Sequence, residues 1–239
     1  MLVYGRNVFN QIQNDPDSIE ELYVQQGIKD KNIQREIQSL NCNKRAVSRS
    51  FLDKMTKNAS HQGIVAKVKE IPTYSIQDLL SKKDKDKKGL YVALDGVQDP
   101  RNVGAILRTC DCVGADGVIL CKHNSAGLTP AAIKASTGAA YTVPVSIVTN
   151  LSQTLKSLKK EGYWVVGTDM DHARDYRKGM YEEPTIIVIG SEGKGISPIV
   201  KKQCDYMVTL PMVGTITSLN ASVACAVLLY EVLNHRQPL

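Results

Sequence analysis

The stretch IIVIGSEGKGIS, residues 186–197, takes the chain from an apolar strand directly into a glycine-rich loop. Its first four residues are β-branched, which is typical of a strand buried on both faces. Glycines let a loop backbone approach a ligand and donate amide hydrogens to it. The loop is not a P-loop, because Ile196 occupies the lysine position, and Asp205 only loosely supplies the acidic residue of a Rossmann fingerprint. The stretch therefore argues against ATP and NAD, and predicts either a ligand-binding loop or a tight strand-to-helix connection.

Apolar runs alternate with helical patterns on both sides of this stretch. Strands are expected at Leu90–Leu94, Val118–Cys121, Val143–Val148, Trp164–Thr168, Thr185–Ile189 and Met207–Leu210. Helices are expected at residues 100–113, 130–137, 151–161 and 197–203, with a final helix at about 218–235. This alternation predicts an α/β fold, a mostly parallel sheet with helices on both faces. The ligand site of such a sheet lies beyond the carboxyl ends of its strands.

Two more loops follow predicted strands. The first, DPRNVGAILRT at residues 99–109, begins a helix with Asp99 as the N-cap and Pro100 in the first turn. Arg101 and Arg108 share one face of that helix, which suits an anionic ligand or two ordinary surface arginines. The second, LPMVGTITSLNASVACAVLLYE at residues 210–231, carries Ser218 as the expected N-cap of the final helix. That helix is apolar nearly all round, so we expect it in a core or at a subunit interface.

Composition limits the class of protein. Of 239 residues, 43% are hydrophobic and 23% charged, which is typical of a globular protein and excludes disordered and fibrous chains. Six cysteines form no CxxC pair, which argues against a zinc ribbon or a thioredoxin motif and favours mostly buried thiols in a reducing compartment. The first residues lack the apolar run of a signal peptide, and Leu219–Tyr230 is too short to span a bilayer. We expect a soluble cytoplasmic protein.

The charge is unevenly distributed along the chain. Residues 1–88 contain 16 basic and 11 acidic residues, whereas residues 89–239 contain 14 and 13. The first segment therefore holds most of the excess of basic residues. This excess indicates either a polyanionic partner or a solvated lysine-rich surface. The run KKDKDKK at residues 82–88 predicts a linker at 70–88 between a first domain at 1–69 and a second at 89–239. The first domain is expected to be small and mixed α/β, with helices at Asn7–Gln13 and Ile33–Leu40 and strands at Leu22–Gln25 and Gly63–Val68.

Taken in order, the three loops resemble the motifs of the SpoU family, which belongs to the SPOUT superfamily. Members of the SpoU family are RNA ribose 2′-O-methyltransferases. The matching segments are DPRNVGAILRT, VIGSEGKGIS and LPMVGTITSLNASVA, and the likeness covers about residues 89–236. In the first domain, LVYGRNVF and HQGIVA resemble the start and end of the RNA-binding domain in the branch that methylates a guanosine of 23S rRNA. GTITSLN departs only conservatively from the motif of many relatives.

The resemblance implies a deep trefoil knot near the C-terminus, an exception to the rule against threaded chains. It also implies that S-adenosylmethionine binds in the knot loops, that the protein is a homodimer through its C-terminal domain, and that the first domain binds RNA. No metal is expected, because the sulfonium is already a strong electrophile.

The family motifs carry over to individual residues. Arg108 matches the arginine at the reacting ribose, Asn102 and Glu192 match residues that support the site, and Ser218 and Asn220 match polar residues near the methyl group. Residues expected at the cofactor are Ile189, Gly190, Leu210, Met212, Gly214 and Leu219. The role of Arg108 stays open between a transiently deprotonated base and a charged clamp for a phosphate and the developing alkoxide.

Basic residues of the first domain are candidates for RNA phosphate contacts. They are Lys29, Lys31, Arg35, Lys44, Arg45 and Arg49. His61 is expected to be structural or RNA-facing and not a base.

The resemblance as a whole implies S-adenosylmethionine-dependent 2′-O-methylation of a ribose, that of a guanosine in 23S rRNA. A tRNA ribose methyltransferase of the same family, an antibiotic-resistance enzyme acting on an rRNA adenosine, and a non-catalytic RNA-binding or ribosome assembly factor are the alternatives. The full first domain argues against the tRNA enzyme. Retention of Asn102, Arg108, Glu192 and Asn220 argues against a non-catalytic protein.

Overall fold

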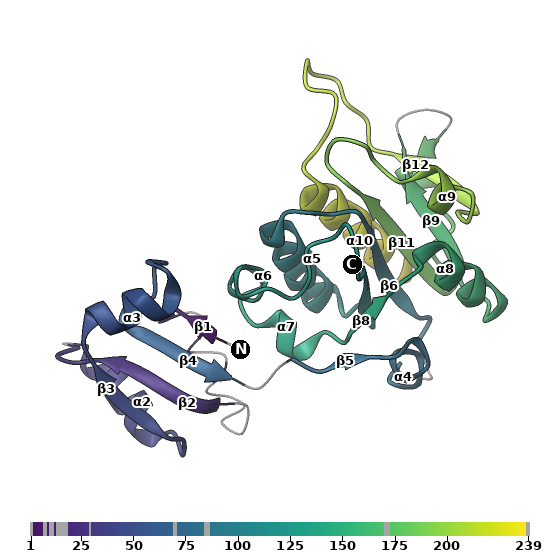
Figure 1. Ribbon diagram of the computed structural model, residues 1–239. Coiled ribbons are helices and arrows are strands. Elements are labelled where there is room, and N and C mark those ends of the chain that lie inside the picture. Colours follow the sequence, from purple (N-terminus) through teal and green to yellow (C-terminus); the bar gives the residue numbers. More distant parts are fainter. Residues whose placement is uncertain are drawn as a thin grey trace. The chain divides into compact units, whose positions relative to one another are not determined.

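The computed structural model describes residues 2–6, 9, 12, 19–28, 30–68, 71–83, 87–169 and 173–237. The chain divides into two compact units, Met1–Ile71 and Pro72–Leu239. Each unit has its own sheet (Figure 1). No helix among the described residues is long and apolar enough to cross a membrane.

The first unit is built on a small mixed sheet. Its described strands are β1 (Leu2–Tyr4), β2 (Ile19–Gln25), β3 (Lys44–Val47) and β4 (Ile64–Val68). In the order β1-β4-β2-β3, β4 is antiparallel to both of its neighbours and β3 is parallel to β2. This confirms the two strands that the sequence predicts. The predicted helix Asn7–Gln13 falls mostly outside the described residues.

Two described helices complete this unit. Helix α2 (Lys31–Ser39) corresponds to the predicted helix, and Asp30 caps it by accepting from the Asn32 and Ile33 amides. Helix α3 (Arg49–Thr56) begins after the N-cap Ser48. The sequence pattern predicted neither β3 nor α3, because three exposed residues precede Val47 and the helix is short.

The second unit is built on a wholly parallel sheet. Its described strands are β5 (Thr73–Tyr74), β6 (Leu90–Asp95), β7 (Gly117–Cys121), β8 (Val145–Val148), β9 (Trp164–Thr168), β10 (Arg174–Asp175), β11 (Thr185–Gly190) and β12 (Tyr206–Thr209). Their order is β10-β12-β9-β11-β6-β7-β8-β5, and every pairing in it is parallel.

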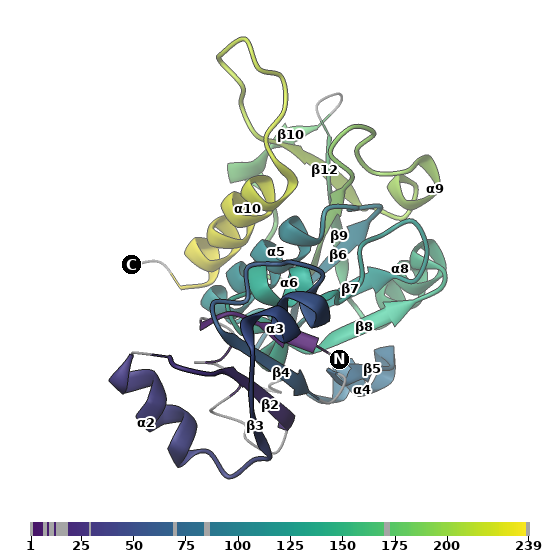
Figure 2. The same ribbon diagram turned by 60° about the vertical axis from the view of Figure 1, so that its left-hand side comes forward.

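Helices cover both faces of this sheet, as predicted (Figure 2). One face carries α5 (Pro100–Val113), α6 (Pro130–Ala135), α7 (Ala139–Thr142) and α10 (Ala221–Arg236). The other carries α4 (Ile76–Ser81), α8 (Leu151–Lys160) and α9 (Pro198–Lys201). A short 3-10 helix, η2 (Tyr176–Lys178), follows β10. Side chains from α4, α8 and α9 pack with alternate residues of the strands to form one hydrophobic core.

The predicted linker at 70–88 needs correction. Thr73 and Tyr74 form β5, which pairs with β8, and Ser75 caps α4. Leu79 of α4 is buried in the core of the second unit. The lysine run at 82–88 follows this helix instead of marking a long connection, so the second unit begins at Pro72.

The expectation of mostly buried thiols is also wrong. All six cysteines are free, but only Cys110 and Cys225 are buried, and Cys112 is exposed.

Candidate functional site

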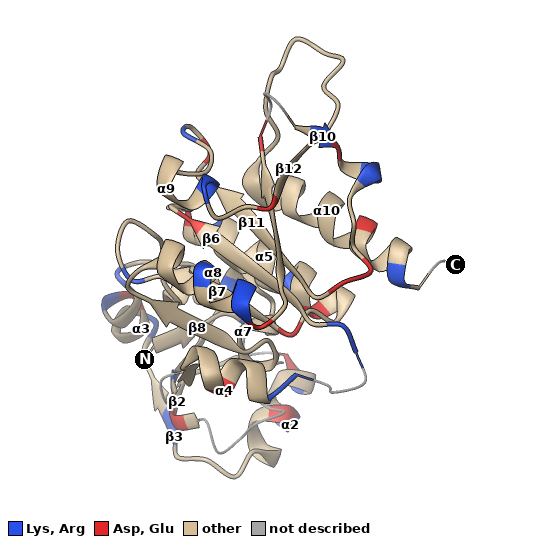
Figure 3. Ribbon diagram, turned by 90° about the vertical axis from the view of Figure 1, so that its right-hand side faces the viewer, with Lys and Arg blue, Asp and Glu red and all other residues tan. Residues whose placement is uncertain are grey.

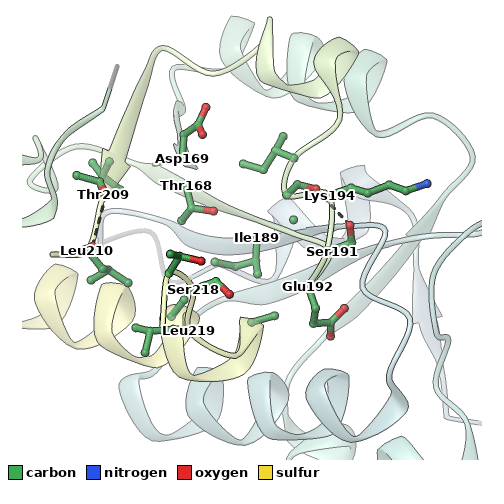
Figure 4. A pocket seen from close by; sticks show the side chains of 18 of the residues that line it. Thr168, Asp169, Ile189, Ser191, Glu192, Lys194, Thr209, Leu210, Ser218 and Leu219 are labelled. Atoms are coloured by element: carbon green, nitrogen blue, oxygen red, sulfur yellow. Dashed lines mark hydrogen bonds between the residues drawn. The ribbon is translucent and has the colours of Figure 1, made fainter. Parts of the chain in front are cut away.

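A cavity of about 450 Å³ lies at the carboxyl ends of β9, β11 and β12 (Figure 4). Most of its wall comes from four segments, residues 168–169, 189–196, 208–212 and 217–224. Lys201 also lines it. The position is the one that a parallel sheet favours for a ligand, and the volume is within the usual range for small-molecule sites.

The glycine-rich loop after β11 forms one wall and is folded back on itself. The Ser191 amide donates to the Gly195 carbonyl over 3.1 Å, and the Gly195 amide donates to the Ser191 carbonyl over 2.9 Å. A Cβ on Gly190 would lie 2.1 Å from the carbonyl carbon of Gly195, so the position requires glycine. The Ser197 amide donates to Asp95 at the end of β6 over 2.7 Å. Both readings of the sequence hold: the loop is a tight connection, and it lines the cavity.

A polar network joins the three sequence motifs. The Asn102 amide group, on α5, donates to the carboxylate of Glu192. The Asn220 amide group donates to Oδ1 of Asn102 over 3.0 Å. Asn102 is 7% exposed, and both hydrogen-bonding ends of its side chain are used. The fold thus brings together three of the predicted catalytic residues from segments up to 118 positions apart.

Asn220, and not Ser218, caps the final helix. Its Oδ1 accepts from the Ser222 amide over 2.9 Å and from the Val223 amide over 3.4 Å, so α10 begins at Ala221. Ser218 instead lines the cavity. Both residue types are good N-caps, and the choice depends on the tertiary contact of Asn220 with Asn102.

Arg108 lies apart from this network. It follows Asn102 by six residues, about 1.7 helical turns, so the two side chains leave α5 on different faces. Arg108 is exposed and is not among the residues that line the cavity. Within the described chain, no hydrogen bond or ion pair holds its guanidinium.

Most of the residues predicted at the cofactor line the cavity. Ile189, Gly190, Leu210, Met212 and Leu219 do so, whereas Gly214 is not part of the lining. Ile196, Val208, Ala221 and Ala224 add to its apolar lining, and charged side chains line it as well. A lining that combines apolar and charged side chains suits a nucleoside joined to a charged amino acid.

Sequence reasoning assigned no site role to several polar residues of the cavity, among them a threonine, an aspartate and two lysines. Thr168, Asp169, Lys194 and Lys201 line it, and the Lys201 ammonium forms an ion pair with Asp169. Asp169 follows β9 directly, but its proximity to the glycine-rich loop depends on the strand order, which the sequence does not reveal.

Lys and Arg residues of both units are coloured blue in Figure 3. The predicted RNA-contacting residues belong to the first unit. Lys31 and Arg35 lie on α2, Lys44 and Arg45 on β3, and Arg49 begins α3; all five are exposed. Lys29 lies outside the described residues. In the described structure no ion pair neutralises these five side chains.

His61 has a structural role in the same unit. It is 4% exposed, Nε2 lies 2.9 Å from Asp53, and Nδ1 accepts from the Gly63 amide over 3.0 Å. Both ring nitrogens are therefore engaged within the fold.

Among the described residues, no group of three or more His, Cys, Asp or Glu side chains is placed to hold a metal ion.

Comparison with known proteins matches both units to one family. The SpoU rRNA methylase family matches residues 89–230, and the substrate-binding domain of RNA 2′-O ribose methyltransferases matches residues 2–74. A Staphylococcus haemolyticus protein assigned to the TrmH family of tRNA/rRNA methyltransferases is 43% identical over 241 residues, covering 99% of this chain and 96% of that protein. Its Bacillus subtilis counterpart YacO is 45% identical over 193 residues, covering 80% and 77%.

Solved structures agree with this assignment. The SpoU methyltransferase AviRb from Streptomyces viridochromogenes, in complex with the cofactor AdoMet, superimposes with a TM-score of 0.83 at 25% identity, covering 99% of this chain and 90% of that one. A TrmH/SpoU tRNA modifying enzyme from A. aeolicus has a TM-score of 0.59 at 31% identity, covering 67% and 82%. The chain therefore belongs to the SpoU family of RNA methyltransferases, which use S-adenosylmethionine.

Proposed function

We propose that the protein transfers a methyl group from S-adenosylmethionine to the ribose 2′-hydroxyl of one guanosine in 23S rRNA. The observation that carries this proposal is the network of Glu192, Asn102 and Asn220 beside an apolar cavity. The first unit supports rRNA as the substrate, because it is a separate folded body with five exposed basic side chains and matches a substrate-binding domain.

The apolar wall of Ile189, Leu210, Met212 and Leu219 would hold the cofactor, and the tightly folded loop at Gly190 would bound it on one side. When bound, the cofactor supplies an electrophilic methyl group. Glu192, Asn102 and Asn220 fix the start of α10 against α5, and so keep Ser218 and Leu219 at the edge of the cavity. Alignment of this kind can supply several kcal/mol of the barrier reduction.

Arg108 acts at the ribose in this proposal, as a base or as a charged clamp. Since it faces solvent, the RNA must extend from the cavity to it, or a second copy must present its own Arg108. We infer a homodimer through α10, whose Val223 and Tyr230 are 46% and 53% exposed although the helix carries few charges. We also infer the trefoil knot from the family motifs, and a cytoplasmic location from the similarity to bacterial RNA methyltransferases.

The two roles of Arg108 predict different pH dependence. A guanidinium that acts as a clamp works in its charged form, which persists throughout the measurable pH range. For the clamp we expect Arg108→Lys to be slower, because lysine lacks the planar fork, with a plateau in its rate–pH profile at the same pH as wild type. A plateau that moves to lower pH in the lysine variant would instead support the base.

The proposed function is tested by methyl transfer from labelled S-adenosylmethionine to unmodified total rRNA and, separately, to tRNA, followed by mapping of the methylated ribose. We expect one rRNA guanosine to be labelled by wild type and not by Arg108→Ala. Labelling of tRNA alone would contradict the proposed substrate. Labelling of an rRNA adenosine would contradict the guanosine.

A further inference from the structure

Among the described residues, two carboxylates line the cavity, and they stand on opposite sides of it (Figure 4). Glu192 is engaged by Asn102 within the motif network. Asp169 belongs to none of the family motifs quoted above, and it forms an ion pair with Lys201 on α9. The side chain of Asp169 is 21% exposed and that of Lys201 is 44% exposed. An ion pair this exposed adds little stability, so stability alone does not account for Asp169 at a ligand cavity.

The strand order gives Asp169 a specific position. Strand β9 pairs in parallel with β11, from Thr185 opposite Trp164 to Val188 opposite Gly167. Asp169 therefore follows the strand next to the one that carries the glycine-rich loop. Its backbone amide donates to the Val208 carbonyl over 3.1 Å, which fixes it between β9 and β12. In dinucleotide-binding sheets an acidic residue in a comparable place binds ribose hydroxyls.

The chemistry of the pair selects among the polar groups of the cofactor. A carboxylate has about four acceptor sites, so the ion pair with Lys201 does not by itself use up the hydrogen-bonding capacity of Asp169. A ribose offers two neighbouring hydroxyl donors without charge. The α-ammonium of the methionine part is disfavoured here, because the Lys201 ammonium would repel it. The adenine ring fits the apolar wall better than this charged corner.

We propose that Asp169 accepts hydrogen bonds from the ribose 2′- and 3′-hydroxyls of S-adenosylmethionine, and that Lys201 positions its carboxylate. Asp169 is then a binding residue for the adenosine part of the cofactor, and Lys201 is a positioning residue. The inference rests on the cofactor of the family and is independent of which RNA is methylated.

The test is calorimetric titration with two unreactive ligands, S-adenosylhomocysteine and 5′-methylthioadenosine, which lacks the amino acid. We expect Asp169→Asn to raise the Kd for both ligands about tenfold, as for the loss of a hydrogen bond to a charged group. Lys201→Met should weaken both ligands by a smaller factor. Lys202→Met is the matched control, because Lys202 is exposed and does not line the cavity, and it should bind like wild type.

Deoxy ligands identify the contacted group. The 2′- and 3′-deoxy analogues of 5′-methylthioadenosine should bind wild type about tenfold more weakly than the ribose form. For Asp169→Asn, the deoxy analogues should bind almost as tightly as the ribose form does. The reason is that the variant has already lost the interaction to which the hydroxyl contributes.

Three results would overturn the inference. The first is a Kd for both ligands that Asp169→Asn leaves unchanged, and the second is a loss of affinity for S-adenosylhomocysteine but not for 5′-methylthioadenosine. The third is a deoxy analogue that loses as much affinity with Asp169→Asn as with wild type. If Asp169→Asn does not fold, as judged by thermal unfolding, the wild-type series still decides, because equal affinity for ribose and deoxyribose ligands excludes the contact. Failure of the proposed RNA methylation would leave these binding results unchanged, so the two proposals are tested separately.

Discussion

Gly190 shows how closely the end of β11 approaches the returning loop. A Cβ there would lie 2.1 Å from the Gly195 carbonyl carbon and 2.3 Å from the Ile196 nitrogen, and both are backbone atoms that cannot rotate away. We expect Gly190→Ala to lower the free energy of unfolding by about 1–3 kcal/mol, as overpacking does, and to weaken S-adenosylmethionine binding. Urea unfolding and calorimetric titration measure the two effects.

Gly193 is the matched control in the same loop, because a Cβ there would meet nothing within 4 Å. Gly193→Ala should change stability by less than about 0.5 kcal/mol. Equal stability of the two alanine variants would show that the loop does not need its close turn.

Asn102 is the central residue of the polar network. Asn102→Ala would leave the Glu192 carboxylate and the Asn220 amide without their shared partner. We expect a loss of about 1–3 kcal/mol in the free energy of unfolding. Asn220→Ala should also cost stability, because it removes the cap of α10 as well. In urea unfolding the double variant should lose less than the sum of the two single losses, and strict additivity would contradict the network.

Asp116 gives a pH-dependent effect on stability. Burial raises the pKa of Asp116 above its ordinary value, although nearby Lys83, Arg236 and Lys87 and the Leu90 amide oppose the shift. The folded state then holds more protons than the unfolded state, so stability falls as the pH rises from about 4 through the folded pKa. The Leu90 amide donates to Oδ2 of Asp116 over 2.7 Å. Asp116→Asn keeps an acceptor for this amide and removes the charge.

We therefore compare the free energy of unfolding of the asparagine variant with that of wild type at each pH. The difference should favour the variant more at pH 7 than at pH 3.5. Urea unfolding at the two pH values measures this difference. The same stability difference at both values would contradict the raised pKa.

At the scale of elements, helix α10 has two different faces. Cys225, Leu228 and Leu229 are fully buried against the fold, while Val223 and Tyr230 are exposed on the same nearly uncharged helix. If the exposed face is the dimer interface, Val223→Asp should shift the protein from dimer to monomer in sedimentation velocity. Ile199→Asp on α9 is the control, since Ile199 is 63% exposed on the opposite layer. A dimer that survives Val223→Asp would exclude this face.

The elements that the sequence predicted are those whose signal is local. Helix α5 follows from Asp99, Pro100 and an apolar stripe, and the central strands follow from their continuous apolar runs. Elements β5 and α4 were missed because the lysine run beside them dominated the pattern. The motifs identified Asn102, Glu192 and Asn220, whereas Asp169 became visible only once β9 was found next to β11. Pairing between distant strands is a tertiary property that local propensity does not contain.

At the scale of the whole molecule, the two units predict separable binding. The first unit carries Lys44, Arg45 and Arg49 exposed on β3 and at the start of α3, and the cavity belongs wholly to the second unit. If these side chains contact phosphates, replacing all three by alanine should weaken RNA binding and reduce the slope of log K against log salt by about two to three. S-adenosylhomocysteine affinity should stay at the wild-type value. The matched control replaces Lys156, Lys160 and Lys202, which are exposed on the second unit, and removes the same charge. Equal losses of RNA affinity in the two triple variants would mean that net charge, and not the surface of the first unit, attracts the RNA.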